Sequence, residues 1–185
     1  KHMAAITEPL KVGELLRQMD TYTGTFIVRC ALQLAPLVFV RPGELRQAEW
    51  NDINLDTAEW RFKASKTHQD HIVPLSHQAV DILKSIYPYS GHGRYVFPSH
   101  RSDTRPMSNN AVLSAFRRMG IAIEEMSGHG FRAMARTLLA ERLRYPEIII
   151  EHQLAHQVRD VHGRAYNRTK FLDDRKKMMQ DWANY

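Results

Sequence analysis

The first two predicted elements are helices, because apolar residues recur at helical spacing over residues 12–19 and again over residues 26–38. Residues 22–24, Tyr-Thr-Gly, break the pattern between them. The second stretch is apolar on nearly every side, which is typical of a helix at the centre of a domain. Residues 41–45, Arg-Pro-Gly-Glu-Leu, then predict a turn leading into a short helix that ends near Trp50.

Residues 51–76 change character, since short apolar runs alternate with polar breaks, as is typical of strands. The runs are Ile53 with Leu55, Trp60 with Phe62, and Ile72 with Val73. They predict a small antiparallel sheet of about three strands.

Most of the remaining chain is predicted to be helical. We expect a helix capped by Ser76 that runs to about residue 87, and further helices over 108–119, from about 129 past 143, from Pro146 to about 154, and over 171–182. Residues 88–94 are expected as a loop, 95–97 as a short extended piece and 100–106 as a basic loop. The expected fold class is therefore α+β, mostly α, a helical core with a small three-stranded antiparallel sheet.

Length and composition fit one globular domain, with 185 residues, 43% hydrophobic and 25% charged. No apolar run approaches the length of a membrane span, and no signal peptide is evident. The single cysteine, Cys30, excludes a disulfide framework within this chain and favours a reducing compartment such as the cytoplasm. Residues 1–4 resemble a tag remnant and leader, so we expect the domain to span residues 5–185.

The balance of charge favours a polyanionic partner. The chain has 26 Lys and Arg against 20 Asp and Glu, which gives a net charge of +6 and a pI near 9.6. Nucleic acid is the commonest partner of such a surface. The candidates for phosphate contact, which could also be merely a solvated face, are Arg101, Arg105, Arg117 and Arg118.

Taken singly, the other polar candidates have plain structural explanations. His129 and Arg132 are three apart on a predicted helix, which is typical of a surface pair. Arg41 could simply pair with Glu44 at a helix start.

A metal site is not expected. His152 and His156 are four apart, but the chain contains no HExxH, no HxxEH and no cysteine pair. We therefore expect neither a metal nor another cofactor.

The order of the polar motifs changes the interpretation. Along the chain come Arg41-Pro42-Gly43-Glu44-Leu45, then Lys66 seven positions before Val73-Pro74-Leu75, His129-x-x-Arg132, Leu154-Ala155-His156, and Tyr166 ten residues later. Together they resemble the tyrosine recombinases, the family of phage and prophage integrases, over about residues 8–183. The segments ELRQAEWNDINLD and YNRTKFLDDRKKMMQDWANY are most similar to integrases of the satellite-phage type.

Within the residues that resemble the family, the departures from its pattern are small. A larger departure concerns the domains that usually come before them. Phe131 stands where many relatives have Leu, and Ala155 where many have Gly, and neither change removes a polar group. The arm-binding and core-binding domains that usually come first do not fit in this chain. The resemblance therefore implies an isolated catalytic domain with the fold of DNA breaking and rejoining enzymes.

The resemblance implies that Tyr166 attacks a DNA phosphodiester and forms a 3′-phosphotyrosyl link. A tyrosine phenol has a pKa of about 10 and is a poor nucleophile unless its anion is stabilised. His156 and the arginines suit that task. Arg41 and Arg132 also suit a bidentate clamp on the non-bridging oxygens, where negative charge builds up.

Two further roles come from the resemblance. Lys66, on a hairpin, is the family's candidate for the general acid that protonates the leaving 5′ oxygen. His129 would assist proton transfer and hold the phosphate. No metal is required by this scheme.

The implied activity is site-specific recombination that integrates or excises a prophage or genomic island. The implied partners are double-stranded DNA attachment sites, further copies in a tetrameric synapse, and host and directionality factors, without a membrane. The expected location is the bacterial cytoplasm, at the nucleoid. Two alternatives stay open, a type IB topoisomerase that relaxes DNA and a DNA-binding module without catalysis.

The last predicted helix carries a stripe that something must cover: Phe171, Leu172, Arg175, Met178, Met179 and Trp182. The stripe packs either on its own domain or, as in many relatives, on a neighbouring protomer.

Overall fold

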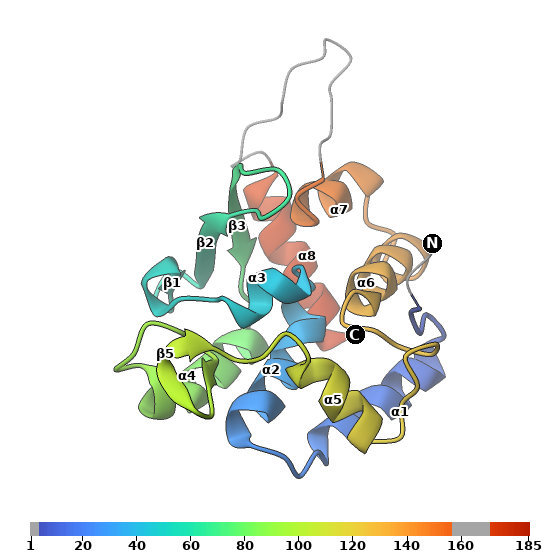
Figure 1. Cartoon of the computed structure of the whole chain (residues 1–185). Helices are drawn as coiled ribbons and strands as arrows, with labels where there is room; N and C mark the ends of the chain where they lie inside the picture. The colour runs from blue at the N-terminus through green and yellow to red at the C-terminus, as the bar shows by residue number, and fades with distance from the viewer. Residues whose placement is uncertain (1–3, 157–170) are drawn as a thin grey trace.

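One buried helix forms the centre of the molecule. A computed structural model describes residues 4–156 and 171–185. Helix α2 (Phe26–Val38) crosses the middle of the domain, and its buried residues lie on several sides, which confirms the prediction of a central helix (Figure 1). The helices packed against it include α1 (Pro9–Asp20), α4 (His77–Ser90) and α5 (Ala111–Arg118).

The predicted antiparallel sheet is present. Its strands lie in the order β1 (Ile53–Asn54), β2 (Glu59–Lys63) and β3 (Asp70–Pro74). Trp60 on β2 lies opposite Ile53 on β1 and Val73 on β3. All of β3 after its first residue is buried, because the C-terminal helix α8 packs against it.

The segment after residue 40 is not the single short helix that was predicted to end near Trp50. Helix α3 (Pro42–Arg46) stops earlier, and a 3-10 turn, η1 (Trp50–Asp52), follows it. Between them the backbone pairs with a distant segment, since Glu49 bridges to Tyr95 and the carbonyl of Ala48 accepts from Val96 N at 2.9 Å. These long-range bonds replace the helical ones.

Helix α4 begins as predicted but ends later. The hydroxyl of Ser76 caps it by accepting from Ala79 N at 3.3 Å. The prediction of a loop from residue 88 was wrong for its first three positions, because the helix includes Pro88 and ends at Ser90. The buried hydroxyl of Ser90 holds this last turn, since it accepts from Trp50 Nε1 and donates to the carbonyl of Val96 at 2.8 Å.

The predicted basic loop over residues 100–106 is largely a strand. It forms a hairpin of β4 (Pro98–Ser99) and β5 (Ser102–Pro106), which lies near α5 at the front of the molecule (Figure 1). The strand residues Ser102 to Pro106 carry no apolar alternation, so the pattern could not reveal the pairing. Helix α5 is correspondingly shorter than predicted and begins at Ala111.

Three helices complete the chain: α6 (Gly130–Glu141), α7 (Glu147–Gln153) and α8 (Leu172–Asn184). Helix α6 ends before the predicted position past residue 143, and Arg144 in the following turn has a left-handed φ of 58°.

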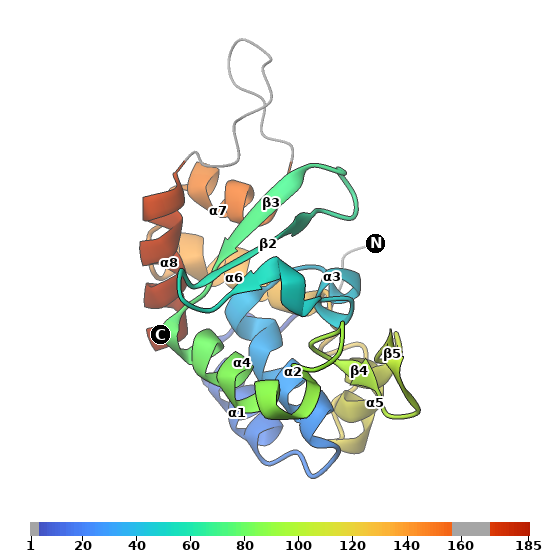
Figure 2. The same cartoon turned by 90° about the vertical axis from the view of Figure 1, so that its left-hand side faces the viewer.

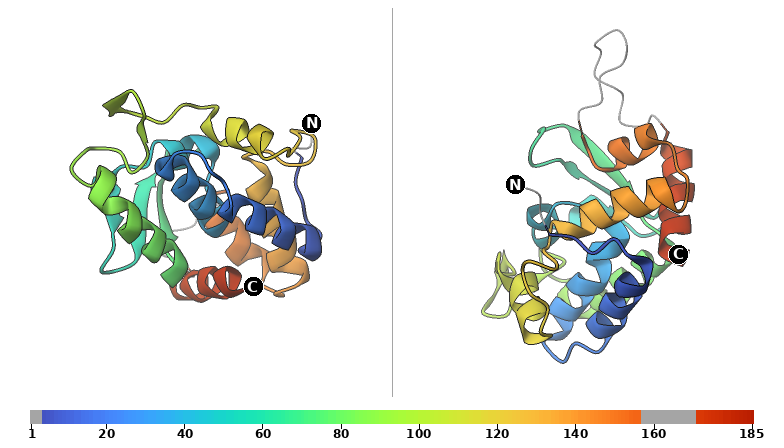
Figure 3. Two further views of the ribbon diagram at one scale, coloured as in Figure 1. Left: turned by 90° about the horizontal axis from the view of Figure 1, so that it is seen from below. Right: turned by 90° about the vertical axis from the view of Figure 1, so that its right-hand side faces the viewer.

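The stripe on α8 is covered by its own domain. Met178, Met179 and Trp182 are buried, and Trp182 Nε1 donates to the carbonyl of Pro36 on α2 at 2.8 Å. Helix α8 contacts α2, α7 and β3, and Figure 3 shows it against the body of the molecule. Packing within the protomer therefore explains the stripe.

Two opposite edges of the molecule are formed by different elements. In Figure 2, α8 lies along one edge, whereas α3, the β4–β5 hairpin and α5 lie along the other. The turn between β2 and β3 projects toward that second edge. The candidate site lies at the start of α3 and at the start of α6, near this turn.

Candidate active site

Arg41 and Glu44 form a buried ion pair at the start of α3. Arg41 is the N-cap residue, and its Nη1 donates to Glu44 Oε1 at 2.9 Å while its backbone N donates to Glu44 Oε2 at 2.9 Å. The side chains are 13% and 5% exposed. The pairing considered from the sequence is thus present, and it fixes the arginine in place.

Glu44 also holds the turn that carries Lys66. Its Oε1 accepts from the backbone N and from the hydroxyl of Ser65, each at 2.9 Å. Burial by itself would raise the pKa of Glu44, but the hydrogen bonds from Ser65 and Arg41 hold it below its usual value. Lys66 follows in the turn between β2 and β3, exposed to solvent. Glu44 therefore joins two elements that the sequence analysis treated separately.

Arg132 is held by backbone carbonyls from two distant segments. Its Nη1 donates to the carbonyl of Phe39 at 3.0 Å, and its Nη2 donates to the carbonyl of Leu154 at 2.7 Å. Burial and the nearby charge of Arg41 lower the pKa of Arg132 to about 10, so it stays charged at neutral pH. Two guanidinium groups close enough to repel each other make a site that favours an anion.

His129 lies beside both arginines, as the N-cap residue of α6. Partial burial lowers its pKa, and the charges of Arg132 and Arg41 lower it further. The imidazole is therefore neutral near pH 7, when it can both donate and accept a hydrogen bond.

His156 joins the cluster from the far side of Arg132. Its Nε2 lies 3.2 Å from Arg132 Nη2, and its Nδ1 is hydrogen-bonded to Glu151 Oε2. Glu151 also accepts from Arg136 Nε at 2.6 Å. Burial would raise the pKa of Glu151, yet the bonds from His156 and Arg136 keep it low. Glu151 thus favours the tautomer of His156 with the proton on Nδ1, which leaves Nε2 to accept from Arg132.

Ala155, one residue earlier, has a left-handed φ of 51°. This is a conformation that glycine adopts without cost. The geometry explains why glycine suits this position in the family pattern, and it shows that Ala155 is strained here.

The structure thus brings together Arg41, His129, Arg132 and His156, and it places Lys66 in a turn tied to Arg41 through Glu44. Tyr166 lies outside the described residues. Glu44 and Glu151 were not predicted as parts of the site. The spacing of Glu44 from Arg41 was visible, but the bond from Glu44 to Ser65 spans 21 positions and had no local signal.

The four arginines predicted to contact phosphate divide into two groups. Arg101 and Arg118 line one pocket of about 590 Å³, between the start of α2, the β4–β5 hairpin and α5. Arg105 and Arg117 are exposed on β5 and α5. All four belong to the hairpin and helix on the same edge as α3 (Figure 2).

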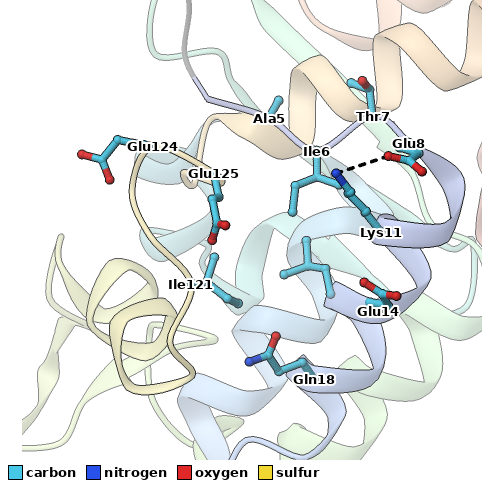
Figure 4. Close-up of a pocket in the computed structure, with 11 residues that line it drawn as sticks. Ala5, Ile6, Thr7, Glu8, Lys11, Glu14, Gln18, Ile121, Glu124 and Glu125 are labelled. Atoms are coloured by element: carbon cyan, nitrogen blue, oxygen red, sulfur yellow. Dashed lines mark ion pairs between the residues drawn. The ribbon is translucent and has the colours of Figure 1, made fainter.

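A second pocket has the opposite charge. It measures about 600 Å³, and Figure 4 shows glutamates around it with Lys11, which pairs with Glu8 at 3.4 Å. The other carboxylates are Glu14, Glu124 and Glu125. This pocket repels a polyanion, so it is not a candidate for a phosphate site.

Within residues 4–156 and 171–185, no three His, Cys, Asp or Glu side chains gather in a way that could hold a metal ion. Over the same part of the chain, no helix is long and apolar enough to span a membrane.

Two arginines and two histidines lie together at one point of this fold, which makes the cluster a candidate active site. The model of the phage integrase family matches residues 7–172. The chain belongs to the phage integrase family.

Individual relatives agree with this assignment. The integrase of Enterobacteria phage P4 is 38% identical over 188 residues, covering 93% of this chain and 43% of that protein. The chain spans about half the length, or slightly less, of the curated relatives it matches.

Solved structures show the same fold. The integrase from mycobacterium phage Brujita matches with a TM-score of 0.73 at 17% identity, covering 97% of this chain and 58% of that chain. A lambda integrase tetramer bound to a Holliday junction matches with a TM-score of 0.62 at 18% identity, covering 85% of this chain and 48% of that chain.

Proposed function

We propose that the chain is the catalytic domain of a tyrosine-type site-specific DNA recombinase, spanning residues 5–185. The observation that carries the proposal is the cluster of Arg41, His129, Arg132 and His156, with the Lys66 turn tied to it through Glu44. Membership of the phage integrase family supports the same conclusion.

The cluster suits the phosphate of a phosphodiester while it is transferred from one oxygen atom to another. Arg132 uses three of its hydrogen bonds to Phe39, Leu154 and His156, which orient the guanidinium before a substrate arrives. An arginine has five N–H donors, so within the described contacts donors remain for a phosphate oxygen. A preorganised cation pair of this kind stabilises charge that develops in the transition state.

The proposed reaction gives each of these residues a role. Tyr166 Oη attacks the phosphorus, a new phosphorus–oxygen bond forms, and the bond to the 5′ oxygen breaks. Lys66 supplies the proton that the leaving 5′ oxygen needs. His129 and His156 hold the phosphate, and the His129 imidazole accepts the proton that the Tyr166 phenol loses on attack. Religation is the reverse sequence, so no metal or other cofactor enters the scheme.

We further propose that the substrate is double-stranded DNA at attachment sites and that the full-length protein works as a tetrameric synapse. The lambda integrase tetramer on a Holliday junction supports this assembly by its shared fold. Arg101, Arg105, Arg117 and Arg118 are the proposed phosphate contacts outside the cluster. Host and directionality factors would act on the full-length protein, in the bacterial cytoplasm at the nucleoid.

The test is covalent attachment to a nicked suicide DNA substrate, resolved on a denaturing gel. Tyr166→Phe should abolish the covalent species and leave DNA binding nearly intact, because only the phenolic oxygen is lost. A covalent species that persists in the variant would move the nucleophile to another residue.

The topoisomerase alternative is separated by substrate. Incubation of the full-length protein with supercoiled plasmid that lacks an attachment site should leave the plasmid supercoiled. Relaxation without recombination would support the topoisomerase, and tight binding of the wild-type domain without any covalent species would support the non-catalytic module.

A further inference from the structure

A buried polar joint lies behind the cluster, where β3, α7 and α8 meet. We call His71, Gln153 and Arg175 the buried joint. Arg175 is 1% exposed, and its Nε donates to Gln153 Oε1 at 2.9 Å while its Nη2 donates to the carbonyl of Ile72. His71 Nε2 lies 3.0 Å from the backbone carbonyl of Gln153.

Burying the charge of Arg175 in the joint costs free energy. Burial lowers the pKa of Arg175 to about 10. Burial, and next the charge of Arg175, lower the pKa of His71 to about 3, so this histidine is neutral and its Nε2 donates to Gln153. Gln153 Nε2 is buried and finds no hydrogen-bond acceptor in the described structure. Apolar residues of similar size would fill such a place at lower cost.

The position of the joint suggests a function for these buried polar groups. Gln153 is the last residue of α7, and next to it the carbonyl of Leu154 accepts from Arg132. His156 follows three positions after Gln153. Arg175 lies in the first turn of α8, so its bond to Gln153 spans 22 positions. The joint therefore fixes the end of α7 and the start of α8 to each other and to β3.

Resting on the proposed function, we propose that Arg175 is a positioning residue for strand cleavage. Its guanidinium holds the end of α7, with the Leu154 carbonyl and His156, in the geometry that orients Arg132. It also anchors the chain on the C-terminal side of Tyr166. In this proposal Arg175 acts through Gln153 and not on the substrate itself.

The test uses this chain with Arg175→Met, which keeps an unbranched apolar stem and removes the hydrogen-bond donors. Single-turnover formation of the covalent complex on nicked DNA should slow by about 100-fold, because misplacing a reacting group by about 1 Å costs a rate of that order. The dissociation constant for an uncleaved duplex should stay within about twofold, since the joint lies away from Arg101, Arg105, Arg117 and Arg118, the proposed phosphate contacts outside the cluster. The matched control is Arg142→Met, at an exposed arginine after α6, which should leave both quantities unchanged.

Two further measurements separate positioning from mere stability. A 5′-bridging phosphorothiolate substrate, whose sulfur leaves without a proton, should not rescue Arg175→Met, although it should rescue Lys66→Ala. Gln153→Glu keeps an acceptor for Arg175 and should cleave faster than Gln153→Met. If Arg175→Met fails to fold, the pair of Gln153 variants carries the test.

The proposed function and the positioning role of Arg175 would be overturned by different results. No covalent complex with the wild-type chain would overturn the proposed function. A wild-type cleavage rate in Arg175→Met, or equal rates for the two Gln153 variants, would overturn the positioning role while the proposed function stands. Losses of DNA affinity and thermal stability that match the loss of cleavage would show that the joint only stabilises the fold.

Discussion

Replacing Glu44 with glutamine should destabilise the domain in a pH-dependent way. Four hydrogen bonds end on the Glu44 carboxylate, three of them on Oε1 and one on Oε2, each at 2.9 Å. In Glu44→Gln the amide oxygen can keep the three donors, but the amide nitrogen then faces the backbone N–H of Arg41. A buried donor without an acceptor costs about 1–3 kcal/mol.

The lost charge adds to that cost, because the Arg41 guanidinium keeps its burial and loses its anion. Removing one partner of a buried ion pair costs about 3–5 kcal/mol in total. We take the lower end, about 3 kcal/mol, because Arg41 is partly exposed and water can reach it. For a domain of this size that loss lowers the melting temperature by roughly 6–12 °C.

The sign of the pH dependence follows from the lowered pKa of Glu44. A carboxyl whose folded pKa lies below its unfolded value of about 4.3 stabilises the fold above that pH. The stabilisation is lost as the pH falls through the folded value. The difference in unfolding free energy between wild type and Glu44→Gln should therefore be largest near pH 7 and shrink below about pH 4.

Urea unfolding followed by circular dichroism at several pH values measures this difference. Glu14→Gln, at an exposed carboxylate on α1, is the matched control and should change stability by less than about 0.5 kcal/mol. A Glu44→Gln variant as stable as wild type at pH 7, or a loss that does not vary with pH, would refute the reasoning.

Four other outcomes are expected. Lys66→Ala should slow cleavage of ordinary DNA and be partly rescued by a 5′-bridging phosphorothiolate; equal defects on both substrates would remove Lys66 from the role of acid. Trp182→Ala should lower the unfolding free energy of the isolated chain by about 3–5 kcal/mol, since the ring is buried and its Nε1 binds a backbone carbonyl, and unchanged stability would contradict packing within the protomer. Ala155→Gly should raise stability by about 1 kcal/mol in the same urea assay by relieving the left-handed strain. Removing Arg101 and Arg118 together should weaken DNA binding and flatten its dependence on salt by about 0.9 in the logarithmic slope for each phosphate that is no longer neutralised, and an unchanged slope would show that they are only solvated.

Local patterns predicted most of the secondary structure. The helical periodicity of residues 26–38, the three strands and the cap at Ser76 were all correct, because each depends on residues close together in the chain. The errors fell where distant segments pair. The early end of α3 and the β4–β5 hairpin depend on backbone bonds that no local pattern encodes.

The candidate residues were also readable from the sequence, as residue types in a fixed order. Their roles remain proposals, and that of Tyr166 concerns a residue outside the described structure. What the sequence left open was how they are held. Glu44 joins Arg41 to the Lys66 turn, and two carbonyls from distant segments orient Arg132.

The C-terminal helix shows the same division. The sequence by itself determined that α8 has a stripe to bury, since the spacing of its apolar residues follows from the helix period. Only the tertiary structure decided that the stripe faces α2, α7 and β3 of the same protomer. Burying a hydrophobic surface is favourable against any partner that excludes water. The periodicity therefore shows that the stripe must be buried, but not which element buries it.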